Sequence, residues 1–326
     1  MKKLILIALI GTVLISCRKD EIDNTDGPNL TDVYGEFAVL ETLDVSQLNA
    51  DFSAGQNPFF TCKMSKIINW ELTITGQTSG AKKTIEGTSN ELNASNSSWN
   101  GSTTELPIFR AEACDVILTF DGEPDTLFAA ITVDQAKTNA GFLIADFETG
   151  WLSGWTSFIQ SGAQMDFNVK TDGTAPENDA YYNLQGEVDW DYLVGLVDFN
   201  ASAYGGVTLP LTSNSDNLWF NAMVYGDAAF QNTIMLFRFD EDENEDGSFN
   251  ATNEDQYSYE FNVDWVGWRL VSIKYADLVG NPAGGGVLNP DKLNKVSMLH
   301  LADPVSGLAK SKLDYLIFTE NGPLQP

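Results

Sequence analysis

The chain has 326 residues, with 46 Asp and Glu against 18 Lys and Arg, so its formal net charge at pH 7 is −28. So acidic a chain repels phosphate backbones, which excludes nucleic acid as an expected partner and disfavours anionic polymers. Hydrophobic residues make up 43% of the sequence, enough for a substantial core. The length predicts about two domains, and short apolar runs between Gly-rich turns predict an all-β fold.

The N-terminus has the layout of a secretory signal. Lys2 and Lys3 precede an apolar run from Leu4 to Ile15, which at about 12 residues is too short to span a bilayer as a helix. The run Leu14-Ile15-Ser16-Cys17 resembles the lipobox of bacterial lipoproteins. The resemblance implies a signal peptide over residues 1–16 and lipid on Cys17. A plain signal peptide with an incidental Cys is the alternative.

Residues 17–30 are predicted to be the lipidated Cys and a tether. Arg18-Lys19-Asp20-Glu21 follows Cys17, and Cys-x-Lys-Asp-Glu resembles the surface-export tag of Bacteroidota-type lipoproteins. This resemblance implies a protein anchored by lipid in the outer membrane and exposed at the cell surface. A charged linker without an export role is the alternative. Gly27-Pro28 punctuates a polar stretch that is typical of a tether.

Residues 31–138 read as short strands separated by Gly, Ser and Asn clusters. Trp70–Thr75 alternates apolar and polar side chains, as a half-buried strand does, and Cys114–Phe120 and Leu127–Val133 predict later strands. Turn signals about every 8 to 12 positions fit a small β-sandwich. The pattern resembles the Ig-like or PKD-like modules of surface lipoproteins, which implies a spacer role.

Cys62 and Cys114 remain once Cys17 carries lipid. An isolated cysteine pair in an oxidising envelope compartment usually bonds, so the sequence predicts a disulfide between them. Two buried free thiols are the alternative.

Residues 142–326 form a second predicted unit that is rich in aromatics. Its clearest strands are Leu218–Tyr225, Ile234–Phe239, Tyr257–Val263, Trp268–Ile273 and Lys312–Phe318. Their order resembles the galactose-binding-like jelly roll used by several carbohydrate-binding modules. The pieces that carry the resemblance are Asp146-Phe147-Glu148, Val263–Arg269, Ser272–Leu278 and Leu313–Ile317. The resemblance implies a β-sandwich, and such a fold does not settle function.

An acidic run, Asp240 to Gly247, lies between two predicted strands. Oxygen ligands at alternate positions before a Gly are typical of a calcium loop, which makes Asp240, Asp242, Asn244 and Asp246 candidate calcium ligands. The bidentate acid of an EF-hand would fall at Asn253, so the loop is not an EF-hand. A solvated hairpin tip is the alternative.

Aromatic residues could stack on the apolar face of a sugar ring while polar side chains bond its hydroxyls. One candidate location is the loops, with Trp151, Trp155, Trp190 and Tyr192. The other is an outward sheet face. Alternation places outward a set that combines aromatics, amides and charges: Trp219, Asn221, Tyr225, Arg238, Glu260 and Asn262. Core packing is the competing interpretation for each Trp.

His300 is the only histidine, and it lies in an apolar run. The composition therefore argues against a Ser-His-Asp apparatus and against a His-ligated metal. A carboxylate pair for glycoside hydrolysis needs only Asp and Glu, so that alternative stays open.

The sequence as a whole resembles the surface glycan-binding proteins of starch-utilisation-type systems. This resemblance implies a non-catalytic lipoprotein that captures a polysaccharide, neutral given the acidic chain, beside an outer-membrane transporter complex. The alternatives are a surface adhesin or assembly protein that binds another protein, and a cryptic glycoside hydrolase.

Overall fold

The computed structural model describes residues 35–160, 164–187, 192–230, 232–280, 282–302 and 308–326. The predicted signal peptide, the lipidation site Cys17, the tether and Trp190 lie outside the described residues. The all-β prediction is confirmed, since the described chain consists of strands and short 3-10 turns. No helix in these ranges is both long enough and apolar enough to cross a membrane.

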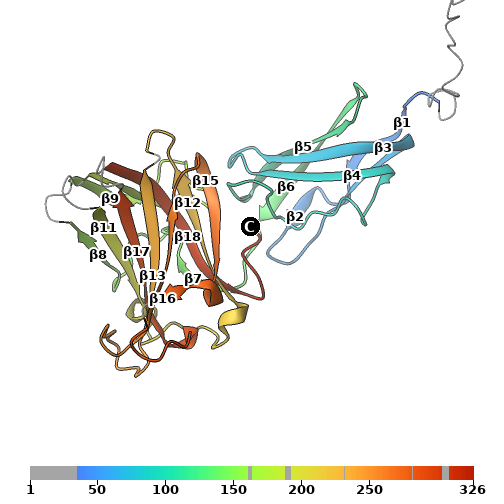
Figure 1. Cartoon of the computed structure of the whole chain (residues 1–326). Helices are drawn as coiled ribbons and strands as arrows, with labels where there is room; N and C mark the ends of the chain where they lie inside the picture. Colours follow the sequence, from blue (N-terminus) through green and yellow to red (C-terminus); the bar gives the residue numbers. More distant parts are fainter. Residues whose placement is uncertain (1–34, 161–163, 188–191, 231, 281, 303–307) are drawn as a thin grey trace, which may run out of the picture.

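The first unit is built on one connected six-stranded sheet, drawn in blue to green in Figure 1. The strand order is β1-β3-β5-β6-β2, and β4 pairs with β3. Its strands are β1 (Val39–Val45), β2 (Asn49–Asp51), β3 (Phe60–Gly76), β4 (Lys82–Leu92), β5 (Glu112–Phe120) and β6 (Thr126–Gln135). Strict alternation along β3 and β5 buries every second side chain in a single core. The Ig-like or PKD-like assignment stays a prediction.

The predicted disulfide is wrong in this structure, because Cys62 and Cys114 are both free and buried. Cys62 lies near the start of β3, whereas Cys114 pairs with Gly76 at its end. A strand of 17 residues is roughly 55 Å long, and a disulfide needs Cα atoms within about 7 Å. Burial raises the pKa of the Cys62 thiol to about 11 and that of Cys114 to about 12, so both stay protonated.

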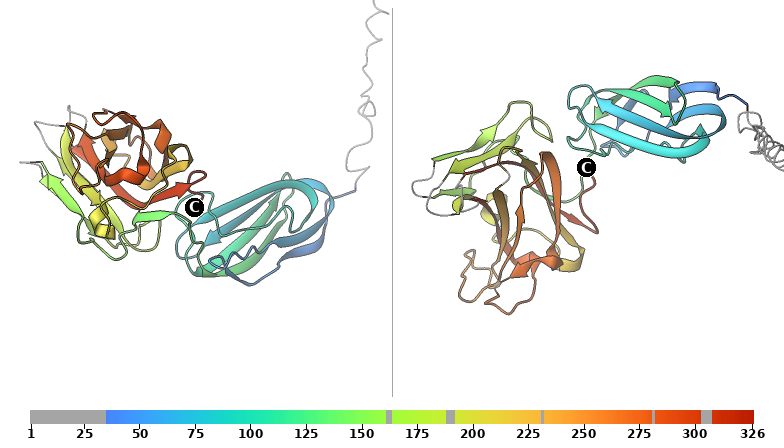
Figure 2. Two further views of the ribbon diagram at one scale, coloured as in Figure 1. Left: turned by 90° about the horizontal axis from the view of Figure 1, so that it is seen from below. Right: turned by 45° about the horizontal axis from the view of Figure 1, so that its top comes forward.

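The second unit is a sandwich of two six-stranded sheets. The β12 sheet has the order β15-β12-β18-β10-β9, with β7 on β18, and the β13 sheet has the order β16-β14-β13-β17-β11-β8. The five clearest predicted strands correspond to β12, β13, β14, β15 and β18, and Figures 1 and 2 show the two layers from three directions. The strands are β7 (Phe142–Ala145), β8 (Thr156–Ile159), β9 (Gln164–Lys170), β10 (Tyr181–Glu187), β11 (Leu193–Asn200), β12 (Leu218–Gly226), β13 (Thr233–Glu241), β14 (Gln256–Asn262), β15 (Gly267–Lys274), β16 (Val279–Gly280), β17 (Leu293–Ala302) and β18 (Leu308–Glu320).

Aromatic rings fill the space between these two sheets. Phe220 of β12 contacts Phe237 and Phe239 of β13 at ring-centroid distances of 4.8 and 5.3 Å. All three side chains are at most 1% exposed. Burying large rings between layers is the main source of stability in such a sandwich, and it fixes which face of each strand points outward. The short 3-10 turns lie at the ends: η1 (Ala201–Tyr204), η2 (Ser215–Asn217), η3 (Tyr275–Asp277) and η4 (Pro290–Lys292).

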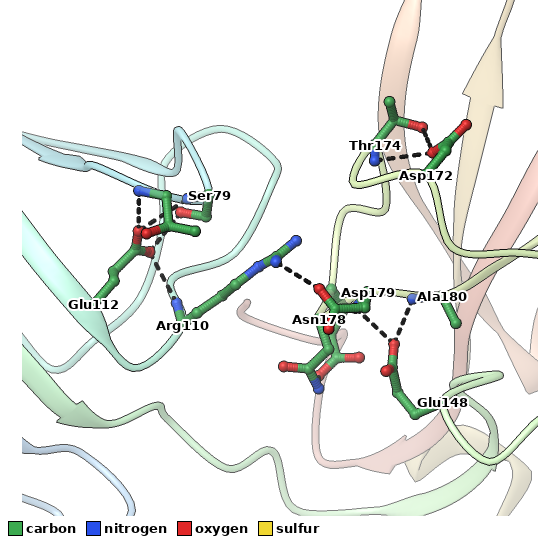
Figure 3. A network of polar contacts seen from close by, with 11 residues as sticks. Ser79, Arg110, Glu112, Glu148, Asp172, Thr174, Asn178, Asp179 and Ala180 are labelled. Atoms are coloured by element: carbon green, nitrogen blue, oxygen red, sulfur yellow. Dashed lines mark hydrogen bonds and ion pairs between the residues drawn. The ribbon is translucent and has the colours of Figure 1, made fainter.

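The loop between β4 and β5 joins the two units. Ile108 N donates to Pro176 O at 2.8 Å, and Arg110 Nη1 lies 3.0 Å from Asp179 Oδ1. Figure 3 shows the Arg110 side chain reaching across to Asp179. The backbone N–H groups of Asp179 and Ala180 in turn donate to one oxygen of Glu148. The first unit is thereby docked against the β12 side of the sandwich, which leaves the β13 sheet turned away from it (Figure 1).

Candidate functional site

The outward face of the β13 sheet carries polar side chains in register across its strands. Arg238 of β13 lies opposite Ser297 of β17, which lies opposite Asp198 of β11. Two residues further along β13, and so on the same face, Asp240 lies opposite Gln256 of β14 and Lys295 of β17. Residues directly opposite each other in antiparallel strands share a face. We call the set the polar band: Asp198, Arg238, Asp240, Gln256, Lys295 and Ser297.

Short contacts tie the polar band together. Lys295 Nζ lies 3.0 Å from Asp240 Oδ2 and 3.9 Å from Asp198 Oδ2. Ser297 Oγ donates to Asp198 Oδ1 at 2.5 Å, and Gln256 Nε2 donates to Asp240 Oδ1 at 2.7 Å. Arg238 is held more loosely, with its Nε 3.6 Å from Asp240 Oδ1. The band is therefore held in place before any ligand arrives, which lowers the entropy cost of binding.

Arg238 is the most exposed charged group of the polar band. The Asp240 side chain is 1% exposed and that of Asp198 is 18% exposed, whereas the Arg238 side chain is 26% exposed. The two carboxylates hold the cations in position, and the guanidinium keeps donors free to face solvent because Arg has five N–H groups. The two positive and two negative charges of the band balance.

An apolar band lies beside the polar one. Leu236 of β13 lies opposite Leu299 of β17, which lies opposite Leu196 of β11, and Leu196 lies opposite Phe158 of β8. The three leucines are partly exposed and Phe158 is 46% exposed. A pyranose ring has an apolar C–H face and a rim of hydroxyls. A surface that sets an apolar strip against oriented donors and acceptors matches that chemistry.

The sequence prediction of one mixed outward face is wrong, because its six residues lie on opposite sheets. Arg238, Glu260 and Asn262 do lie on the outward face of the β13 sheet, the last two on exposed positions of β14. The other three belong to β12, in the sheet on the far side of the sandwich: Trp219, Asn221 and Tyr225. Consecutive strands of a jelly roll need not share a sheet, and alternation alone does not report the crossover.

Chain segments close the outward face of the β12 sheet. Asn221 is fully buried, and its Oδ1 accepts from Leu324 N at 3.0 Å. The Trp268 Nε1–H donates to Thr174 O at 2.8 Å. Lys312 Nζ lies 4.8 Å from the ring centroid of Tyr225. These side chains hold the C-terminus and the 171–176 loop in place, so we assign them to structure.

The loop aromatics differ in exposure, with Trp155 buried and Trp151 and Tyr192 exposed. Trp155 is 5% exposed and packs against Phe199 in the core, so its predicted ligand role is wrong. Trp151 is 39% exposed and Tyr192 is 53% exposed. Trp151 borders an open hollow of about 390 Å³ with Tyr182 and Phe167, at the edge between the two sheets. Among the described residues, no other predicted ligand residue lines that hollow.

The structure separates Asp240 from the other three predicted calcium ligands. Asp240 belongs to the polar band, in ion pairs with Lys295 and Arg238. Asp242 Oδ2 accepts from Gly247 N at 2.7 Å, and Asn244 Oδ1 accepts from Asp246 N at 2.9 Å, so these two groups cap their own turn. Asp242, Asn244 and Asp246 therefore lie together in one turn and Asp240 lies outside it, and calcium binding by this loop stays a prediction.

The sequence reasoning missed Asp198, Lys295 and Ser297 as site residues. Both segments carry a signal, since Leu196–Asn200 and Lys295–Leu299 place polar side chains at every second position among apolar ones. That signal identifies outward positions but not which strands become neighbours. The pairing of β11 with β17, which are far apart in the sequence, brings the band together.

Comparison with known proteins finds matches only among solved structures. No family model matches the sequence, and no curated protein matches it. A family 11 carbohydrate-binding module from Clostridium thermocellum, in complex with a β-1,3-1,4-mixed-linked tetrasaccharide, is 16% identical with a TM-score of 0.38. That alignment covers 56% of this chain and 98% of the module.

Two further structures align over most of this chain. One comes from work on the promiscuous specificity of carbohydrate-binding modules of the β-sandwich superfamily; it is 11% identical, has a TM-score of 0.38 and covers 88% of this chain and 99% of its own. The other is SGBP-B from a complex xyloglucan utilization locus in Bacteroides uniformis. It is 12% identical, has a TM-score of 0.35 and covers 87% of this chain and 73% of its own. At TM-scores below 0.5, function has to be argued from the side chains of this chain.

Proposed function

We propose that this protein is a non-catalytic glycan-binding protein that holds a polysaccharide along the outward face of the β13 sheet. The observation that carries the proposal is the alignment of a fixed polar band beside an apolar band on one accessible face. The apolar band would take the C–H face of a sugar, and Arg238 with Lys295 would bond its hydroxyls. A shallow face orders few groups, so the affinity per site should be modest.

Charge favours a neutral glycan as the ligand. The four ionic groups of the polar band pair with one another, so the face offers no net positive charge to an anionic sugar. The chain around it carries a net charge of −28, which repels sulfated or uronate-rich polymers. Hydroxyl groups, which need oriented donors and acceptors but no counter-charge, fit the face best.

The lipid anchor and the surface location are part of the same proposal. Cys17 and its flanking residues support them through the lipobox and the export-tag resemblance. The first unit would then act as a spacer, and capture near an outer-membrane transporter complex would follow. Protease shaving of intact cells tests the location: release of the protein is expected, and full resistance would contradict it.

Affinity electrophoresis of the purified protein tests the binding. We expect retardation in a gel cast with one neutral polysaccharide, such as a β-glucan. Arg238→Met should weaken retardation by tenfold or more, because a charge-assisted hydrogen bond contributes about 1.5–3 kcal/mol. Arg269→Met is the matched control, since Arg269 is exposed on β15 of the other sheet and lies over the Trp265 ring.

Two results would contradict glycan binding without catalysis, and a third would contradict its location. Free migration in every polysaccharide gel would point to a protein ligand instead. Release of reducing sugar from a retained polysaccharide would point to the hydrolase alternative. Equal effects of the two arginine variants would leave glycan binding standing but remove it from the β13 face.

A further inference from the structure

Three carboxyl groups converge beneath the acidic loop, at the end of β13. Glu241 is the last residue of β13, Glu243 follows in the loop, and Asp255 directly precedes β14. One oxygen from each of the three lies within 4.8 Å of the others. The segment 284–289 closes the group, since Gly284 N and Gly286 N donate to the two oxygens of Asp255 at 2.6 and 2.7 Å.

Glu241 has one carboxyl oxygen that lacks a hydrogen-bond partner among the described residues. Its side chain is 0% exposed. One carboxyl oxygen accepts from Tyr275 Oη at 2.8 Å and from Asn289 N at 2.9 Å. The other oxygen is buried without a hydrogen-bond partner among the described residues. A buried oxygen of this kind costs free energy unless a ligand supplies the missing contact.

No cation from the described part of the chain compensates the cluster. None of the ion pairs found among the described residues involves Glu241, Glu243 or Asp255, and the nearby Lys292 pairs with Glu245 instead. Burial raises the pKa of Glu241 to about 7, with the carboxyl groups of Glu243 and Asp255 adding to the rise. Burial and Asp255 also raise the pKa of Glu243. Like charges held this close need a counter-ion to stay ionised.

The chemistry of the ligands selects the type of ion. All three groups offer carboxylate oxygen and none offers nitrogen or sulfur, which favours a hard cation over zinc or copper. Calcium binds oxygen at about 2.3–2.6 Å, so oxygens on opposite sides of the ion lie about 4.6–5.2 Å apart. Three oxygens that all lie within 4.8 Å of one another can therefore reach one such ion together.

We propose that Glu241, Glu243 and Asp255 bind one calcium ion, which fastens the β13–β14 loop to the segment 284–289. Glu243 is the partly exposed member of the three and provides the way in from solvent. Gly284 makes room for it, because a Cβ at that position would lie 2.3 Å from Glu243 Oε2. Carbonyl oxygens and water would complete the coordination.

This site is distinct from the one that spacing alone predicts, and the two can be told apart. Glu241, Glu243 and Asp255 lie outside the predicted set of Asp240, Asp242, Asn244 and Asp246. Asp246 is exposed and lies three residues beyond Glu243, so Asp246→Asn is a control that removes the same charge from the same loop. Glu243→Gln is the test variant, because its partial exposure makes misfolding the smaller risk.

The experiment is a calcium titration of the chelator-treated, purified protein, followed by calorimetry and by thermal unfolding without any glycan. Extracellular calcium modules bind with Kd of about 0.1–1 mM, so 10 mM calcium should raise Tm by about 3–5 °C. Glu243→Gln should weaken calcium binding at least tenfold and remove most of the Tm rise. Asp246→Asn should keep both.

Terbium gives a second readout of location. Tyr275 and Tyr257 donate to Glu241 and Asp255 at 2.8 and 3.3 Å, so tyrosine excitation should sensitise bound terbium, and calcium should quench that emission by displacement. Glu243→Gln should lose the emission. The proposal is overturned if wild-type protein shows neither heat nor a Tm shift at 10 mM calcium. It is equally overturned if Asp246→Asn abolishes binding while Glu243→Gln retains it.

Discussion

The two outward faces of the sandwich carry similar residue types and use them in different ways. On the β12 sheet, Asn221, Trp268 and Lys312 all contact other segments of the same chain. On the β13 sheet, the hydrogen bonds and ion pairs found for Arg238 and Lys295 among the described residues join side chains of their own sheet. One face is therefore closed by the C-terminus and a loop, and the other is organised but open.

An outward polar or aromatic residue is therefore not by itself a ligand residue. Asn221 and Asn262 are both amides on outward strand positions, yet the first is 0% exposed and the second is exposed. What lies over the strand decides the outcome: Leu324 N of the C-terminal segment donates to Asn221, whereas the Asn262 side chain is exposed.

A loss of binding at the β13 face could also arise because the sandwich beneath it is destabilised. His300 of β17 allows a test, since it is fully buried beside Phe167. Burial lowers its pKa from the usual 6.5 to about 4. Above pH 6.5 both folded and unfolded chains hold it neutral. As the pH falls from 6.5 to 4, only the unfolded state takes up the proton, so stability falls by up to about 3 kcal/mol.

The predicted measurement is the free energy of unfolding in denaturant at pH 7, 5.5 and 4.5, for wild type and His300→Leu. The variant should lose about 2 kcal/mol less than wild type between pH 7 and 4.5. Comparing slopes cancels both the packing change at position 300 and the titration of the carboxylates that the two proteins share. Parallel pH profiles would show that His300 titrates in the folded state, and the burial argument would fail.

Asn221→Ala tests whether the C-terminal segment closes the outward face of the β12 sheet. The substitution leaves Leu324 N without its hydrogen-bond acceptor and removes the bond to Thr319 Oγ1. We therefore expect a loss of about 2 kcal/mol in the free energy of unfolding. Retention by a polysaccharide gel should not change. Asn262→Ala on the open face is the matched control, with a stability change within about 0.5 kcal/mol. If both variants are equally stable, the C-terminal segment does not seal the β12 face.

Local patterns were enough to predict five strands of the second unit, β12, β13, β14, β15 and β18. The expected strands Ile234–Phe239 and Tyr257–Val263 differ from β13 and β14 by at most two residues at each end. Strict alternation gives this accuracy because one side of each strand faces a core of aromatic rings. The opposite side is solvated or covered, and the sequence does not separate these two cases.

Long-range pairing limited the rest. The Cys62–Cys114 prediction rested on cysteine count and compartment, which carry no information on where strands meet, and the register of β3 with β5 sets Cys114 opposite Gly76. The calcium prediction rested on the spacing of oxygen ligands along the acidic run and did not include Glu241 or Asp255. Successive residues of a strand point to opposite faces, so Asp240 joins the polar band while Glu241 joins the carboxylate cluster.

The smallest expected effect separates the β13 face from the loop aromatics. Phe158 and Trp151 are exposed to similar extents, at 46% and 39%, but Phe158 ends the apolar band while Trp151 packs on Trp155 and Tyr182. Phe158→Ala should weaken gel retention about fivefold, since an aromatic contact contributes about 1 kcal/mol, and Trp151→Ala should change it less than twofold. The reverse order would move the sugar to the hollow beside Trp151. In that case the polar band would be a device for stabilising the sheet, because its ion pairs would then have no outside partner to orient.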